Sequence, residues 1–242
     1  MKTLVIIIGV IVLYVILITM ESFGNAYIII YATHNGKTGH AGLAIDNYNI
    51  IVNEGNTDTV ATGTVSYYDL WPSHDDFGLF SYSKSQQALY YTLPNAIWSQ
   101  PLNIDFLTRL GIPHREGYPP DAVLKLSTTP ADDFALTRFI HETIDSKTAF
   151  NPRFYNCTDF VSDAVAFVTM KKFRAKEFIP FSFTSTPNKL YKKLIQLEGI
   201  ETLKTPQHSI RRSFVRERVL KRKRTSNPFQ TDPVQIAAGQ TI

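Results

Sequence analysis

One thiol and one imidazole are the groups of this sequence best suited to carry out chemistry together. Cys157 is the single cysteine among 242 residues, and it stands in the run YNCTDFV, where a helix is expected to begin. A helix N-terminus carries partial positive charge, which favours thiolate over thiol, and its free N–H groups can bind a developing oxyanion. The positions at helical spacing after Cys157 are all apolar, which places the thiol on the inward-facing stripe. They are Phe160, Val161, Ala164, Val165 and Val168.

A cysteine in an apolar stripe is, most often, a small buried hydrophobe without chemistry. What favours a nucleophile here is His40, which opens an expected strand in the run TGHAGLAID. Its glycine-flanked, small-residue setting leaves room for the ring to lie against another element. Four other histidines are less favourably placed, in a turn, in a loop, between prolines and in mid-helix: His34, His74, His114 and His141.

A catalytic imidazole needs a third polar group to orient it. Residues of a strand alternate between two faces, so Gly42 shares the face of His40. If the chain reverses through a two-residue turn at Asn47-Tyr48, Gly42 pairs with Asn53, and Asn53 lies diagonal to His40. A three-residue turn slips the register by one and brings Glu54 to that face instead. We expect Asn53 to orient the ring, with Glu54 as the alternative.

Hydrophobic alternation, helical spacing and turn residues predict an α+β fold. Strands rich in β-branched and aromatic residues are expected at 27–33, 40–46 and 49–55, with shorter ones at 77–83, 88–94 and 121–128. Helices are expected from Pro130, from about Cys157 to Val168, and from Pro187. This order predicts an antiparallel sheet, with the histidine strand as its second strand along the chain, packed against the helix bearing the thiol.

Length and composition suit one domain with a sizeable core. The chain is 44% hydrophobic and 12% aromatic. A single cysteine excludes an internal disulfide framework and a cysteine-rich metal site. We expect this domain to cover residues 27–203.

Both ends of the chain differ from the domain between them. Lys2 precedes a run of apolar residues and glycine, Leu4–Ile18, and Glu21 follows it. Residues 1–26 are therefore expected to be a signal peptide or an N-terminal membrane anchor, with the body extracytoplasmic, either membrane-anchored or secreted. Residues 204–224 hold nine Lys or Arg and one acid, which gives this segment a net charge of +8. Because the whole chain carries +4, the rest of the sequence carries −4. We expect 204–242 to be a basic, disordered tail, with anionic lipid or nucleic acid as candidate partners.

Two runs of the sequence together resemble a known family. GHAGLAID and YNCTDFVSDAV are similar to motifs of the circularly permuted NlpC-like branch of the papain-like thiol hydrolases. In that branch a histidine opens an early strand, and the cysteine follows at the start of a later helix as N-C-x-x-F. Lecithin retinol acyltransferase and its relatives share this order. The likeness covers roughly residues 27–55 and 150–170.

The resemblance implies a permuted papain-like fold and a thiol-dependent hydrolase or acyltransferase that acts on an amide or ester bond, with cell-wall peptide as one candidate substrate. Cys157 would be the nucleophile and His40 the general base. Asn53 or Glu54 would stand where several relatives have a second histidine. Such a site needs neither a metal nor an organic cofactor. The alternative is a non-catalytic extracytoplasmic binding module on the same fold, in which Cys157 is a buried structural thiol.

Overall fold

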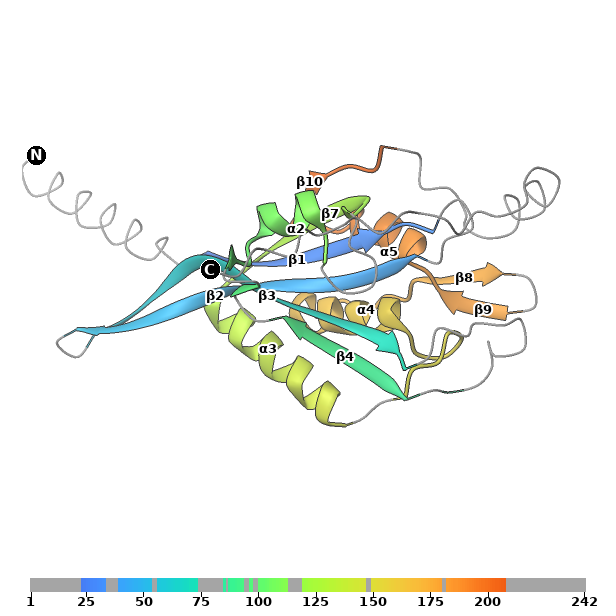
Figure 1. Cartoon of the computed structure of the whole chain (residues 1–242), viewed down its shortest axis with the longest axis horizontal. Helices are drawn as coiled ribbons and strands as arrows, with labels where there is room; N and C mark the ends of the chain where they lie inside the picture. The colour runs from blue at the N-terminus through green and yellow to red at the C-terminus, as the bar shows by residue number, and fades with distance from the viewer. Residues whose placement is uncertain are drawn as a thin grey trace, which may run out of the picture.

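A six-stranded antiparallel sheet forms the centre of the protein (Figure 1). The computed structural model describes residues 23–33, 39–53, 56–73, 85, 87–93, 96–97, 100–112, 119–146, 149–179 and 182–207. In sheet order the strands are β10 (Ile200–Lys204), β7 (Ala122–Thr128), β1 (Gly24–Tyr31), β2 (His40–Asn53), β3 (Asn56–Pro72) and β4 (Ala88–Leu93). Two short hairpins lie outside this sheet: β5 (Ala96–Ile97) with β6 (Gln100–Pro101), and β8 (Lys176–Ile179) with β9 (Ser182–Ser185).

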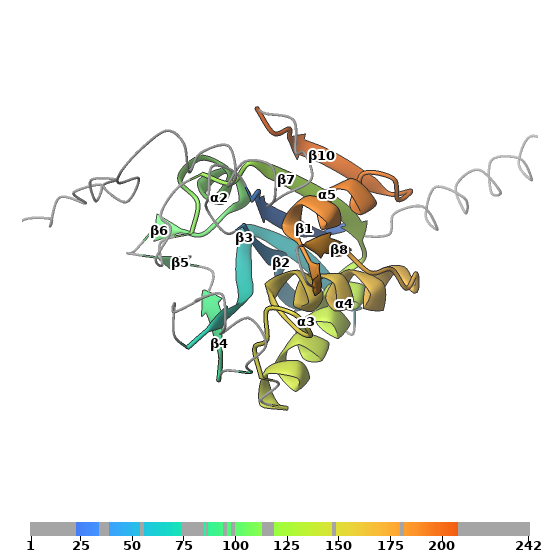
Figure 2. The same cartoon turned by 90° about the vertical axis from the view of Figure 1, so that its right-hand side faces the viewer.

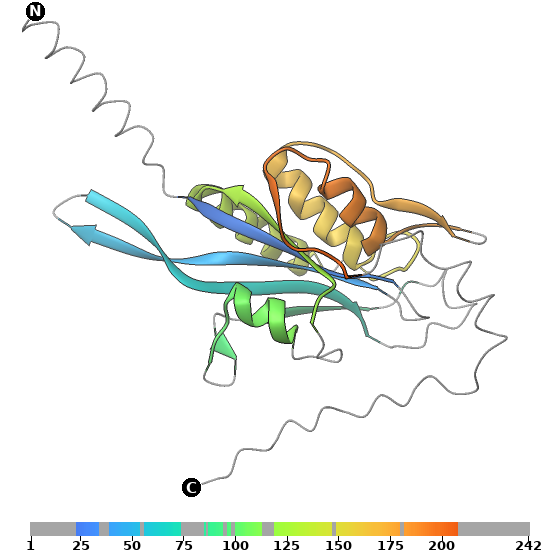
Figure 3. The same cartoon turned by 90° about the horizontal axis from the view of Figure 1, so that it is seen from above.

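Helices cover both faces of the sheet (Figure 3). The helices α3 (Pro130–Asp145), α4 (Cys157–Thr169) and α5 (Pro187–Leu194) pack on one face, and α2 (Ile104–Leu110) packs on the other. Figure 2 shows α4 between α3 and α5, and it contacts both of them. The helix that bears the cysteine is therefore the middle one of its layer.

β1 lies in the interior of the sheet because both of its faces are apolar. Successive side chains of a strand point to opposite faces. The residues of β1 accordingly divide between two cores, Ala26, Ile28 and Ile30 with α3, α4 and α5, and Tyr27, Ile29 and Tyr31 with α2. A strand of this kind is stable only where both faces of the sheet are covered.

The four described helices each begin at a side-chain cap, including the three that pack on one face of the sheet. Thr129 and Asp132 cap α3 reciprocally, Asn156 and Asp159 do the same for α4, and Thr186 caps α5. Each cap satisfies N–H groups that have no partner within the helix. The cap on α4 fixes the residue that follows it as the first of the helix, and that residue carries the thiol.

β2 runs without a turn, so the predicted reversal at residues 47 and 48 is wrong. A bulge falls at Asn47 instead, and hydroxyl groups of β3 hold this residue in the ribbon. Thr62 Oγ1 donates to its backbone carbonyl over 3.1 Å, and Ser66 Oγ donates to its side-chain oxygen over 2.9 Å. The chain reverses only after Asn53, and β2 and β3 form a long ribbon that projects beyond the body (Figure 1).

Most of the other predicted elements are confirmed. The fold class is α+β, and β1, β4, β7, α3, α4 and α5 fall where the sequence indicated them. The sequence did not predict β3, α2, β10 or the two short hairpins, β5–β6 and β8–β9. The predicted strand at 77–83, the chain up to residue 22 and the chain after residue 207 lie outside the described residues. Among the helices that the structure describes, none is long and apolar enough to cross a bilayer.

Gly42→Ala is expected to lower the free energy of unfolding by about 1–3 kcal/mol, a typical cost of overpacking a core. A Cβ at this position would lie 2.0 Å from the hydroxyl oxygen of Tyr67, which is fully buried. Urea unfolding of Gly42→Ala, Tyr67→Phe and the double variant measures the interaction free energy between the two positions. The double variant lacks the closest clashing atom, so its cost should be less than the two single costs together. Strictly additive costs would contradict the contact.

Candidate active site

Asn156 holds the start of α4, and with it Cys157, against the β8–β9 hairpin. Its side-chain oxygen accepts hydrogen bonds from the N–H groups of Thr158 at 2.9 Å and of Asp159 at 3.4 Å. Its Nδ2 donates to the carbonyl oxygen of Ser185 at 3.1 Å. Because both ends of the amide are bonded, the first turn of α4, which carries the thiol, is fixed relative to β9.

His40 lies buried between a carboxylate and the thiol. Its Nε2 is 2.8 Å from Asp69 Oδ2, and the two side chains are 1% and 0% exposed. Asp69 Oδ2 also accepts a hydrogen bond from the Tyr67 hydroxyl at 2.9 Å. Since Nε2 is bonded to Asp69, Nδ1 is the nitrogen left for the hydrogen bond with Cys157. The Trp71 ring packs edge-on against the imidazole, with the ring centroids 4.5 Å apart.

Negative charge around His40 decides its protonation. Burial lowers the pKa of His40, because the charged ring loses its hydration. The charges of Cys157 and Asp69, and the hydrogen bonds to both, outweigh this and raise the pKa to about 10. The ring is therefore held as a cation at neutral pH. An imidazolium next to a thiol stabilises the thiolate, which is the nucleophilic form.

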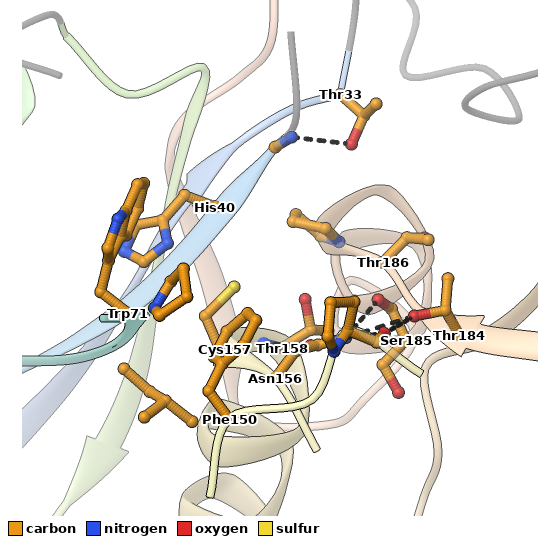
Figure 4. Close-up of a pocket in the computed structure, with 15 residues that line it drawn as sticks. Thr33, His40, Trp71, Phe150, Asn156, Cys157, Thr158, Thr184, Ser185 and Thr186 are labelled. Atoms are coloured by element: carbon orange, nitrogen blue, oxygen red, sulfur yellow. Dashed lines mark hydrogen bonds between the residues drawn. The ribbon is translucent and has the colours of Figure 1, made fainter. Parts of the chain in front are cut away.

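A cleft opens over Cys157 (Figure 4). It contains about 640 Å³ of empty space, part of which is open to solvent. Residues 70–72 of β3 line one side and residues 184–187 line the opposite side, while Phe150 comes from the segment before α4. His40 lines the cleft beside Trp71. The site therefore combines a thiol, an imidazole next to it and an open cleft above them.

The structure brings together two of the four predicted site residues, Cys157 and His40. Asn53 does not join them. It ends the strand that His40 begins, and 14 residues of extended chain span about 40 Å. The prediction that Asn53 orients the ring is therefore wrong. Glu54, the alternative, lies outside the described residues.

Asp69 takes the orienting position. It pairs with Gly42 in the β2–β3 register, so it lies diagonal to His40, the place where an orienting residue was expected. An orienting residue does lie on the neighbouring strand, diagonal to His40, but it is Asp69 and not Asn53. The difference arises because the hairpin reverses later than the sequence suggested. The sequence signal for Asp69 is a lone acid in an aromatic run, SYYDLWP. An acid that shares a strand face with Tyr67 and Trp71 is rarely buried unless it has a partner.

No protein-family model, curated protein or solved structure matches the chain. The chemistry of the site therefore follows from its own geometry, which is a thiol, an imidazole and a carboxylate in one hydrogen-bonded series at the start of a helix. Within the described ranges, no group of three or more His, Cys, Asp or Glu side chains is placed to hold a metal ion.

Asp69→Asn is expected to lower the pKa of His40, because it removes a carboxylate charge 2.8 Å from the ring while keeping the side-chain shape. The folded-state pKa lies above the value of about 6.5 in an unfolded chain. The protonated ring of His40 therefore stabilises the folded protein fully below a pH of about 6.5, and this contribution is lost as the pH rises through about 10. In the variant this loss should occur at lower pH. NMR titration of the His40 ring protons measures the shift.

Tyr67→Phe is the matched control for this titration. It removes the other hydrogen bond to Asp69 Oδ2 and keeps the carboxylate. The pKa of His40 should therefore move much less than in Asp69→Asn. An unchanged pKa in Asp69→Asn, or equal shifts in the two variants, would show that Asp69 is not the charged partner of the ring.

Proposed function

We propose that this protein is a thiol-dependent hydrolase or acyltransferase of the permuted papain-like type, acting on an amide or ester bond. The observation that carries the proposal is the series Cys157–His40–Asp69 in a cleft at the start of a helix. A nucleophile, a proton carrier and an orienting group in contact are the components of covalent acyl transfer. The chain order, histidine before cysteine, agrees with the permuted branch that the sequence resembles.

Acylation uses the proton already held on His40. Cys157 Sγ attacks the carbonyl carbon as the thiolate, so the C–S bond forms and the carbonyl electron pair moves to the oxygen. In the first turn of α4 the N–H groups of Thr158 and Asp159 are bonded to Asn156, which leaves the N–H of Cys157 for the oxyanion. As the tetrahedral intermediate collapses, His40 Nδ1 gives its proton to the leaving amine or alkoxide.

Deacylation reverses the role of His40. The neutral ring takes a proton from water, or from an acceptor alcohol or amine, as that group attacks the thioester carbonyl. The C–S bond then breaks, and the thiolate is restored beside the imidazolium. Asp69 keeps the ring in one orientation through both steps. Attack by water gives hydrolysis, and attack by another acceptor gives acyl transfer.

The partners of the proposed enzyme follow from the same site and from the ends of the chain. The cleft would take a peptide, amide or ester substrate, with cell-wall peptide as one candidate. Extracytoplasmic placement, membrane contact through the N-terminal apolar run, and contact of the basic tail with anionic lipid or nucleic acid stay predictions. The segments on which they depend, 1–22 and 208–242, lie outside the described residues.

Iodoacetamide is expected to alkylate Cys157 rapidly in the folded protein at pH 7, and His40→Gln should slow the reaction about tenfold or more. An ordinary cysteine, with a pKa of about 8.5, is only a few per cent thiolate at this pH. Glutamine removes the cation but keeps an N–H donor for the buried Asp69 carboxylate. Mass spectrometry of the intact protein over time gives the rate constant, and Cys157→Ser is the blank.

His141→Gln is the matched control for the alkylation. His141 also packs against an aromatic ring, that of Tyr68, with the centroids 5.8 Å apart, but it does not line the cleft. The control should react like the wild type. If Cys157 is labelled only after unfolding, the thiol is structural and the binding-module alternative stands. If the two histidine variants react alike, His40 does not activate the thiol, and the proposed site is wrong.

A further inference from the structure

The hydroxyl of Thr158 is a buried polar group without a partner in the part of the chain that the structure describes. Thr158 follows Cys157 in the first turn of α4, is 0% exposed and lines the cleft (Figure 4). Leaving a buried hydroxyl without a hydrogen bond is costly, so each such group in a folded protein requires an explanation.

Three other hydroxyl groups on the described helices have a hydrogen bond that Thr158 lacks. Thr143, Ser162 and Thr169 each donate to the backbone carbonyl four residues earlier. Thr158 is the second residue of α4, so the carbonyl four residues earlier precedes the helix. Its hydroxyl therefore has no carbonyl within α4 to which it can donate.

The hydroxyl groups across the cleft are already bonded within the protein. Thr184, Ser185 and Thr186 each donate to another protein oxygen. They form one wall of the cleft, and their hydroxyl protons already take part in hydrogen bonds within the protein. Thr158 differs from them in having an unbonded hydroxyl and in standing next to the nucleophile in the chain.

We propose that the Thr158 hydroxyl and the backbone N–H of Cys157 together form the oxyanion hole of the site, an inference that rests on the proposed acyl-transfer function. When Sγ adds to a carbonyl carbon, the C–S bond forms and the π electron pair becomes negative charge on oxygen. Both donors belong to the first turn of α4, whose positive end favours that charge. They stabilise the tetrahedral intermediate through hydrogen bonds, and neither transfers its proton.

Thr158→Val tests this inference, with Thr158→Ser as the matched control. Valine keeps the branched shape and removes the hydroxyl, whereas serine keeps the hydroxyl. With p-nitrophenyl acetate as the probe, single-turnover release of p-nitrophenolate measures acylation of Cys157. The valine variant should acylate about 10²–10³-fold more slowly, as expected for the loss of one oxyanion donor. The serine variant should stay close to the wild-type rate.

Iodoacetamide separates this inference from the proposed function. Alkylation displaces iodide from a CH₂ carbon and forms no oxyanion, so Thr158→Val should alkylate at the wild-type rate. Its thermal unfolding midpoint should be unchanged or higher, because a methyl group replaces an unbonded buried hydroxyl.

The remaining outcomes overturn either the role of Thr158 or the proposed function. A valine variant that acylates at the wild-type rate overturns the role of Thr158 alone. Equal losses of acylation and alkylation would indicate a packing role and would also overturn it. A wild-type protein that releases no p-nitrophenolate overturns the proposed function together with this inference.

Discussion

A protonated imidazole inside the protein is the constraint on which the rest of the structure depends. Taking the charge of His40 out of water is unfavourable unless opposite charge surrounds it. Asp69 supplies one partner from β3 at 2.8 Å, and Cys157 supplies the other from α4. Both are distant from His40 in sequence. The cation therefore requires the β2–β3 register and the packing of α4 on the sheet at the same time.

Each partner of the imidazole is itself held by a further contact. The Tyr67 hydroxyl donates to Asp69 Oδ2, and it occupies space that a side chain at Gly42 would fill. Asn156 joins the first turn of α4 to β9. In the proposed mechanism these contacts matter because they fix the positions of the charges before a substrate arrives. A site organised in this way needs little rearrangement during the reaction.

The thiol and the imidazole could be predicted from the sequence because local rules place both. Apolar spacing and a capping residue locate the start of α4, and alternation locates the start of β2. The orienting carboxylate could not be predicted, since its position depends on where a long hairpin reverses. Asn47 looks like a turn residue, but hydroxyls 15 and 19 residues away hold it in the ribbon. The edge strand β10 was missed for a similar reason, because it exists through pairing with the distant β7.

The central claim, that Cys157 and His40 meet in the folded protein, is tested most directly by a reagent that joins thiol and imidazole. 1,3-Dibromoacetone would alkylate Cys157 first. With the sulfur neutral, His40 loses one of the charges that hold its proton, and its ring nitrogen can then displace the second bromide. Peptide mapping should find residues 157 and 40 joined by one acetone bridge. Cys157 carrying the reagent without a bond to His40, or joined to another histidine, would contradict the claim.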